Sequence, residues 1–178
     1  MDLFVFKCFY LMLPAYFANM APVIFQHVFK KLAIPLDFGK KLNDKRLFGK
    51  NKTFRGLIVG TLSGILIAYL QYALHSSGII TVGFTDLSNW LSLGFLMGFG
   101  AILGDLIESF FKRQFDIKPG QSFRPWDQID FALGAMLLSS LVFLYSFLQV
   151  ITILLLTFIL HIIVNHTAYF LHIRKEKW

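Results

Sequence analysis

Long uncharged segments alternate with charged ones along this chain of 178 residues. Three uncharged runs extend from Cys8 to Phe29, from Gly56 to Leu74 and from Leu87 to Gly104. At about 1.5 Å per residue, a helix of each run is long enough to cross the hydrocarbon core of a bilayer. The pattern therefore predicts three membrane-spanning helices. Their glycines recur at a spacing typical of close helix packing, at Gly56, Gly60, Gly64, Gly94, Gly98, Gly100 and Gly104.

The last apolar segment is about twice as long as the others. It runs from Phe131 to Ile173 without an Asp, Glu, Lys or Arg, which is too long for one crossing. We expect a hairpin of two spans that turns near Tyr145 to Gln149. Together with a hydrophobic content of 56%, this predicts an all-α, polytopic integral membrane protein with five transmembrane helices, built as one domain over residues 1–178.

The basic residues are clustered in a way that predicts the orientation. Of 17 Lys and Arg, nine lie from Lys30 to Arg55, four from Lys112 to Arg124 and three from Arg174 to Lys177, and none lies from Gly56 to Ile102. By the positive-inside rule, we expect both basic loops and the C-terminus to face the cytoplasm and the N-terminus to lie outside, in the cell membrane. Topology thus accounts for the net charge of +7, and no nucleic-acid partner is expected.

Acidic residues lie where an apolar protein should not tolerate them. A helix would carry Asp105, Glu108, Ser109 and Lys112 as one polar stripe, because they are spaced i, i+3, i+4 and i+7 at the end of the third span. The next helix would begin with two more acids on one face, Asp127 and Asp130. Carboxylates beside a bilayer are costly, and the usual reason to keep them is a bound cation, a proton path or an ion pair.

Cations surround these acids in the sequence. Carboxylate oxygens suit a hard cation, and nearby basic groups can neutralise phosphate oxygens. We therefore interpret the region as a cytoplasmic-face magnesium site beside a phosphate clamp. The expected metal ligands are Asp105, Glu108, Asp127 and Asp130, and the expected basic groups are Lys112, Arg113, Lys118 and Arg124.

The tail of the first basic loop adds a second group of donors. Residues Lys50, Lys52, Thr53 and Arg55 directly precede or begin the second span, which suits the binding of phosphate at a helix N-terminus. Positive-inside charge alone is the alternative explanation. Acids, a divalent cation and basic groups together are the equipment for phosphoryl or nucleotidyl transfer, with one lipid substrate and one water-soluble substrate.

Two segments resemble a known enzyme family. Ser109 to Arg113, then Lys118, then Asp127 to Asp130 is similar to the S-x-x-K-R-x4-K and D-R-x-D motifs of the phosphatidate cytidylyltransferase (CDP-diacylglycerol synthase) family, and Lys50 to Gly56 resembles its P-K-K-T-x-E-G stretch. The short length, the five expected spans and Arg55 in place of Glu point to its small branch, the CDP-archaeol synthases. The chain departs from the larger family at Gln128, where Arg is usual, and lacks its H-G-G before the Asp pair.

The resemblance implies a reaction. CTP and an isoprenoid ether-lipid phosphate, 2,3-bis-O-geranylgeranyl-glycerol 1-phosphate, would give CDP-archaeol and pyrophosphate with Mg²⁺ as cofactor. It implies that Asp127 and Asp130 form the metal-binding pair, that Asp105 is the upstream acid and that Lys118 belongs to the catalytic group. The assignment of Glu108 as a metal ligand rests on its place in the polar stripe and not on the resemblance. The residues expected to bind substrates are Lys50, Lys52, Thr53, Arg55, Ser109, Lys112, Arg113 and Arg124.

The sequence leaves open other lipid substrates, the oligomeric state and other functions. Phosphatidate could replace the isoprenoid lipid, because an apolar groove discriminates poorly between chains. The oligomeric state is likewise open. A small ion or solute transporter would explain Asp105 and Glu108, but cations on the same face would repel a permeating cation. A purely structural membrane subunit would leave the acids without a purpose.

Overall fold

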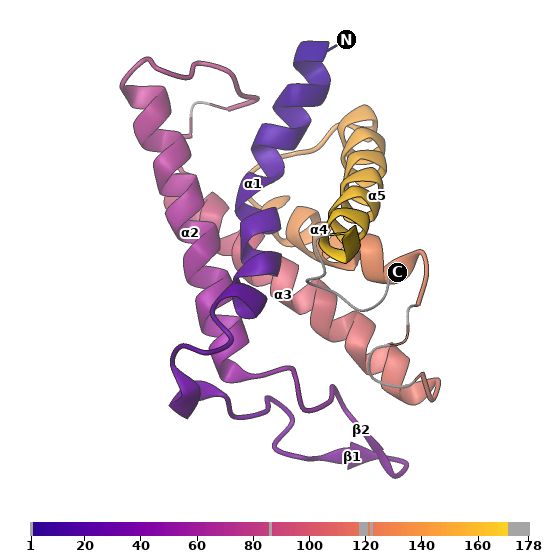
Figure 1. Cartoon of the computed structure of the whole chain (residues 1–178). Helices are drawn as coiled ribbons and strands as arrows, with labels where there is room; N and C mark the ends of the chain where they lie inside the picture. The colour runs from indigo at the N-terminus through magenta and orange to yellow at the C-terminus, as the bar shows by residue number, and fades with distance from the viewer. Residues whose placement is uncertain (1, 86, 118–120, 122, 171–178) are drawn as a thin grey trace.

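The computed structural model describes residues 2–85, 87–117, 121 and 123–170. Within them, the regular secondary structure is helical apart from one small hairpin (Figure 1). A single 3-10 turn, Lys30–Leu32, and two antiparallel strands, β1 (Lys41–Leu42) and β2 (Lys45–Arg46), lie between the first two helices. The expected all-α class is confirmed. The helices are α1 (Asp2–Ile24), α2 (Phe54–Ser76), α3 (Trp90–Gln114), α4 (Trp126–Ser139) and α5 (Phe147–Phe170).

Four helices in the described part of the chain are long and apolar enough to cross a membrane, namely α1, α2, α3 and α5. The fifth expected span, α4, has 14 residues, or about 21 Å of helix, which is shorter than a bilayer core of about 30 Å. The expected hairpin is present, but its turn covers residues 140–146, earlier than the expected Tyr145 to Gln149, since α5 already begins at Phe147. Its first arm is therefore a short helix followed by a loop.

The loop after α4 nevertheless returns the chain to the end of the molecule where α1 begins. Phe84, in the loop between α2 and α3, contacts both Phe4 of α1 and Phe143 of the α4–α5 loop, with ring centroids 5.6 and 6.5 Å apart. Helix α5 then runs back toward the end of the bundle that carries β1 and β2 (Figure 1). Four of the five expected spans are thus long enough to cross a membrane, and the remaining pass consists of α4 and the loop that follows it.

Glycines set the distances between the helices. Gly64 of α2 lies against the backbone of Gly94 and Gly98 in α3, so that a side chain there would overlap main-chain atoms. Gly104 of α3 faces the Asp130 carbonyl of α4 in the same way, and Gly134 of α4 faces the backbone of Gly104. Close backbone approach of this kind is characteristic of small residues in membrane helices. It fixes the end of α3 against the start of α4.

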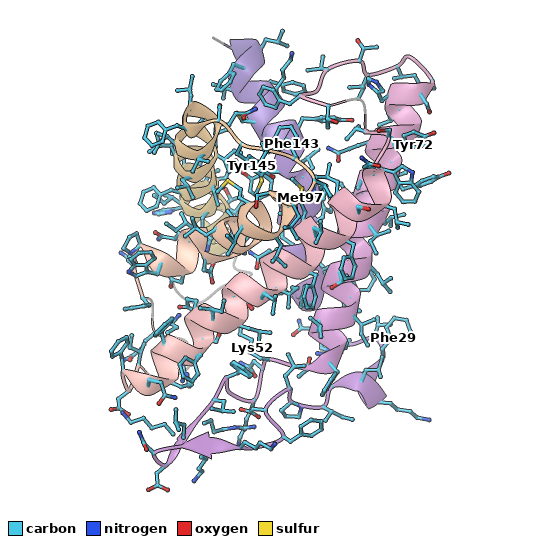
Figure 2. All side chains as sticks on the ribbon, turned by 180° about the vertical axis from the view of Figure 1, so that it is seen from behind. Phe29, Lys52, Tyr72, Met97, Phe143 and Tyr145 are labelled. Atoms are coloured by element: carbon cyan, nitrogen blue, oxygen red, sulfur yellow. The ribbon has the colours of Figure 1, made fainter. Side chains whose placement is uncertain are left out.

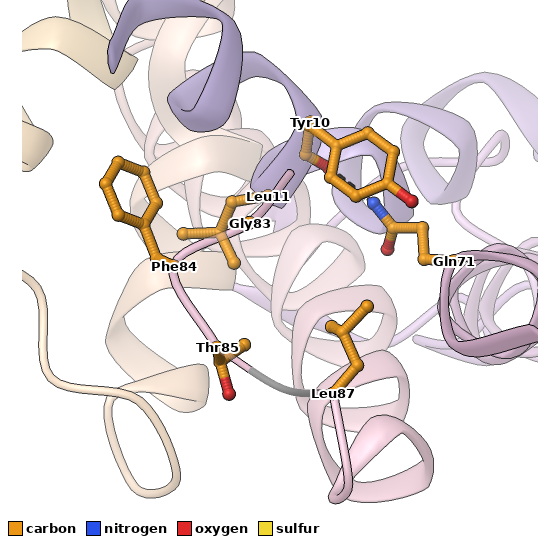
Figure 3. Close-up of a pocket in the computed structure, with 7 residues that line it drawn as sticks. All are labelled: Tyr10, Leu11, Gln71, Gly83, Phe84, Thr85 and Leu87. Carbon is orange, nitrogen blue, oxygen red and sulfur yellow. Dashed lines mark hydrogen bonds between the residues drawn. The ribbon is translucent and has the colours of Figure 1, made fainter. Parts of the chain in front are cut away.

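Helix α1 continues through Pro14, although proline has no N–H to donate to the carbonyl four residues earlier. That carbonyl belongs to Tyr10. The buried Gln71 of α2 donates its Nε2 to it at 2.5 Å (Figure 3). The bond lies beside a small apolar pocket lined in part by Phe84 and Leu87. A neighbouring helix thus supplies the hydrogen bond that proline removes.

The α1–α2 loop is held together by one buried acid, Asp37. Its carboxylate accepts hydrogen bonds from Arg46 at 2.6 and 3.2 Å and from the backbone N–H groups of Gly39, Phe48 and Gly49 at 2.9, 3.3 and 3.1 Å. Burial raises the pKa of Asp37, but these hydrogen bonds outweigh it and lower the pKa to about 2. The loop is therefore a folded element.

Two further contacts place this loop. Backbone hydrogen bonds from Leu36 N to the Lys52 carbonyl and from Phe54 N to the Ile34 carbonyl, 2.8 and 3.0 Å long, join its first part to the residues before α2. The Lys45 ammonium lies 2.5 Å from Asp116, just beyond α3, and 2.7 Å from the carbonyl of Gln114, the last residue of α3. The loop consequently lies over the end of α3.

We predict that Gln71→Leu lowers the free energy of unfolding by about 1–3 kcal/mol, because it leaves the buried Tyr10 carbonyl without a donor. Pro14→Ala restores a backbone N–H that can take the place of Gln71. In the Pro14→Ala background, Gln71→Leu should therefore cost much less. Unfolding of the four proteins in detergent measures this coupling, and an equal loss in both backgrounds would contradict the assignment.

We also predict an acid-sensitive loop. Because the pKa of Asp37 is lower when folded than the ordinary 3.8, its contribution to stability is complete above about pH 4 and is lost as the pH falls toward 2. Hydrogen exchange of residues 39–49, corrected for the intrinsic rate, should accelerate over that range. Asp37→Asn should show fast exchange already at pH 7, and Asp44→Asn, which changes an exposed acid of the same loop, should not. Slow exchange in Asp37→Asn would be the contrary result.

Candidate active site

Three carboxylates meet where α3 and α4 cross. Asp105 and Glu108 lie one turn apart on α3, and Asp130 lies on the first turns of α4. One oxygen from each falls within 4.8 Å of the others. Glu108 is buried, and the other two are partly buried. Three negative charges this close repel one another strongly away from water, so the group needs positive partners.

Two lysines supply part of that charge. Lys52 is the residue just before Thr53, the N-cap of α2. Its Nζ lies 2.6 and 2.5 Å from the two carboxylate oxygens of Asp105. Figure 2 shows Lys52 between the α1–α2 loop and α3. Lys112, one turn after Glu108, has its Nζ 2.9 Å from Glu108 Oε1 and 3.7 Å from Asp127 Oδ2. Each lysine thus binds a different part of the acidic group.

Asp127 lies beside the three clustered acids, one turn before Asp130. Its Oδ2 accepts a hydrogen bond from Phe123 N at 3.0 Å. Its Oδ1 is buried and has no hydrogen-bond partner among the described residues, and neither has Glu108 Oε1, whose ion pair with Lys112 lacks hydrogen-bond geometry. Buried acceptors without donors are destabilising by about 1–3 kcal/mol each.

The donor set fits a divalent metal ion. Oxygens of Asp105, Glu108 and Asp130 converge, and carboxylate oxygens are the ligands that Mg²⁺ prefers. A cation there would also offset the negative charge of these carboxylates. Of the four expected ligands, three form the cluster, and Asp127 lies next to it.

Some of the expected substrate-binding residues surround this cluster. Ser109 is buried on α3, and Thr53 caps α2 by accepting a hydrogen bond from Gly56 N at 3.2 Å. Arg113 lies beside Gly49 of the loop, and its buried Nε has no hydrogen-bond partner among the described residues. Lys50 and Arg124 are exposed, and Lys118 lies outside the described residues.

Arg55 has a different environment from the one expected. Its Nη1 donates to the Gln26 carbonyl at 2.5 Å, just beyond the end of α1. A cation at the C-terminal end of a helix is favourable for the helix dipole, which explains the contact. The structure therefore places Arg55 against α1, and a contact with substrate stays a prediction.

The sequence did not reveal three other contributors to the site. Asp37 organises the loop that carries Lys52, and the pairing of Lys52 with Asp105 joins residues 53 positions apart. Lys45 holds the loop to the end of α3. The sequence signals for them were weak, because buried Asp–Arg and Lys–Asp pairs between distant segments leave no periodic pattern.

Comparison with known proteins agrees with this arrangement. Residues 1–178 match the family described as CarS-like, CDP-archaeol synthase. The CDP-archaeol synthases of Thermofilum pendens, Archaeoglobus fulgidus and Pyrobaculum arsenaticum are 38%, 35% and 37% identical to this chain. The alignments cover 93%, 98% and 100% of this chain and 78%, 98% and 100% of those proteins.

A solved structure is also similar. It is described as an intramembrane enzyme for archaeal membrane lipids biosynthesis, and it superposes with a TM-score of 0.74 at 30% identity over 90% of this chain and 94% of its own. The helices that span a membrane, the matching structure and the family agree with the resemblance that the sequence motifs indicate. The chain belongs to the CDP-archaeol synthase family and is a multi-pass membrane enzyme, a cytidylyltransferase of lipid biosynthesis.

Proposed function

We propose that this enzyme transfers CMP from CTP to 2,3-bis-O-geranylgeranyl-glycerol 1-phosphate and releases CDP-archaeol and pyrophosphate. The observation that carries the proposal is the group of three carboxylates on α3 and α4, Asp105, Glu108 and Asp130, with lysines from two different elements against it. Such a site can hold a metal ion and anionic phosphates together. The substrates and the metal are those that membership of the family suggests.

The cofactor in this proposal is Mg²⁺. Asp105, Glu108 and Asp130 would hold it, with Asp127 as a further oxygen donor or as an acceptor for ligand water. When bound, the metal supplies positive charge to the triphosphate. The residues supply the geometry, because they come from two helices that the glycine contacts hold in one register.

The basic groups would orient the phosphates. Lys52 and Lys112 already form ion pairs with the acids, and Arg113, further along α3, has a buried Nε without a hydrogen-bond partner among the described residues. Charge-assisted hydrogen bonds from such groups fix and neutralise phosphate oxygens. Further contacts are proposed for the exposed Lys50 and Arg124, for the buried hydroxyl groups of Thr53 and Ser109, and for Lys118, which lies outside the described residues.

The reaction needs no strong base in the protein. An oxygen of the lipid phosphate, already anionic, attacks the α-phosphorus of CTP, a new P–O bond forms, and the bond from the α-phosphorus to the bridging oxygen of pyrophosphate breaks. The chain's contribution is to align the two anions and to neutralise the charge that develops, as in other phosphoryl-group transfers. Lys52 and Lys112 are placed for that neutralisation.

The location of the site suits one lipid and one soluble substrate. It lies at the end of the long apolar helix α3, where a lipid phosphate meets water, and the exposed apolar faces of the helices can accommodate isoprenoid chains. We propose that this end faces the cytoplasm, where CTP is present, with the N-terminus outside the cell membrane. A cation transporter is disfavoured, because Lys52 and Lys112 already bind the acids that would have to guide the ion.

The function is tested by incubating the detergent-solubilised enzyme with CTP labelled in its α-phosphate, Mg²⁺ and either the isoprenoid ether-lipid phosphate or phosphatidate. We expect a labelled CDP-lipid from the ether lipid, pyrophosphate in equal amount, and loss of product when the metal is chelated. If phosphatidate gives product and the ether lipid gives none, the lipid substrate is an acyl ester and the proposed isoprenoid substrate is wrong. No nucleotide–lipid product from either would contradict it.

We predict that Asp130→Asn lowers kcat/KM by roughly a hundredfold or more, because it removes a charged ligand while keeping the side chain's shape. Glu108→Gln should have a comparable effect, since Glu108 lies in the same cluster. The control is Asp44→Asn, which removes an exposed acid of the α1–α2 loop and should retain most of the activity. A fully active Asp130→Asn enzyme would remove this cluster from the mechanism.

A further inference from the structure

The ion pair between Lys52 and Asp105 occupies a position that a metal ion would need. Both carboxylate oxygens of Asp105 are within 2.6 Å of the Lys52 ammonium. One of them also belongs to the group of oxygens that converges with Glu108 and Asp130. A divalent cation bound by Asp105 must therefore displace this ammonium or share its oxygens with it.

The backbone of Lys52 cannot follow such a change, but its side chain can. Its carbonyl accepts a hydrogen bond from Leu36 N, and the next residue, Thr53, caps α2. The side chains of Lys52 and Asp105 are 26% and 27% exposed, so the ammonium has access to the space outside the cluster. Rotation of the flexible stem moves the charge without unfolding the loop.

Lys112 differs from Lys52 in this respect. It lies one turn from Glu108 on the same helix and binds Glu108 and Asp127 together, at 2.9 and 3.7 Å. Its side chain is only 14% exposed. Its charge is therefore confined between two acids. Of these two lysines, Lys52 is the one with a single ion-pair partner and the more exposed side chain.

We propose that Lys52 is an exchangeable counter-ion that couples metal binding to nucleotide binding. In the empty enzyme it neutralises Asp105. When a divalent cation takes that carboxylate, the ammonium turns to a phosphate oxygen of the nucleotide. The proposal deepens the function proposed above and rests on the metal and nucleotide sites assigned there.

The exchange has a thermodynamic consequence. A metal ion alone must displace Lys52 from Asp105, and a nucleotide alone must draw Lys52 away and leave that acid without a cation. Bound together, each ligand removes the obstacle to the other. The two affinities are therefore coupled, and by linkage each ligand strengthens the other by the same factor. Direct contact between the metal and the triphosphate also couples the two affinities, so the exchange is identified by the part of the coupling that is lost when Lys52 is replaced.

The test measures binding of Mn²⁺, a spectroscopic substitute for Mg²⁺, to the full chain in detergent. Electron paramagnetic resonance of free Mn²⁺ gives the affinity with and without a CTP analogue whose α,β-bridging oxygen is replaced by a methylene group, after subtraction of the Mn²⁺ that the analogue binds in the absence of protein. We expect the analogue to strengthen Mn²⁺ binding to the wild type by about tenfold. No turnover occurs, so the readout is independent of catalysis.

The Lys52→Met variant should differ from the wild type both in its Mn²⁺ affinity and in the effect of the analogue. Without nucleotide it should bind Mn²⁺ about tenfold more tightly than the wild type, because the competing cation is gone, and the analogue should strengthen Mn²⁺ binding by a smaller factor than in the wild type. Lys52→Gln, which keeps a hydrogen-bond donor, should change in the same direction and serves if the methionine variant does not fold. The matched control is Lys41→Met, which removes an exposed charge from the same loop and should behave as the wild type.

Two contrary results are distinguishable. If the wild type binds Mn²⁺ but both Lys52 variants bind it no more tightly and keep the coupling to the analogue, Lys52 is a fixed structural partner and the exchange is wrong. If the wild type binds no Mn²⁺ with or without the analogue, the proposed metal site is wrong, and so is the exchange of Lys52 that depends on it.

Discussion

The close contact between α3 and α4 is the constraint on which the site depends. Gly104 lies against the Asp130 carbonyl, and Gly134 lies against the backbone of Gly104. The residue after Gly104 is Asp105, so the same contact that joins the helices also brings the acid of one helix beside the acid of the other. Backbone-to-backbone packing is rigid compared with contacts between long side chains. The distances within the carboxylate cluster are therefore fixed by the fold.

The position of these acids would be unfavourable without the loop between α1 and α2. Carboxylates gathered at the end of a membrane helix repel one another and lose hydration. Lys52 reaches Asp105 only because the loop is folded, and the loop is folded because Asp37 binds Arg46 and three backbone N–H groups. Fold and electrostatics are thus interdependent, and a change at Asp37, far from the reacting atoms, would act through Lys52.

The sequence predicted the features that depend on short-range patterns. Runs of apolar residues identified the long helices, and the i, i+3 spacing placed Asp105 and Glu108 on one face of α3. The short length of α4 could not be predicted, because residues 140–146 of the turn are as apolar as the helices beside them. Contacts between distant segments were equally invisible: Arg55 turns to the Gln26 carbonyl and Gln71 to the Tyr10 carbonyl, and neither pair follows a helical period. The roles of the individual site residues stay predictions.

If the α3–α4 backbone contact positions the proposed metal-binding carboxylates, a single methyl group added between the two helices should remove most of the activity. A Cβ at position 104 would overlap the Asp130 carbonyl oxygen, whereas a Cβ at position 56 would make only an ordinary contact, 3.5 Å from Pro22. Transfer of labelled CMP to the lipid phosphate is measured for Gly104→Ala and Gly56→Ala, with folding checked by thermal unfolding. We expect a folded Gly104→Ala protein whose kcat/KM is reduced roughly a hundredfold, and a Gly56→Ala protein close to the wild type. Full activity in a folded Gly104→Ala enzyme would contradict this expectation.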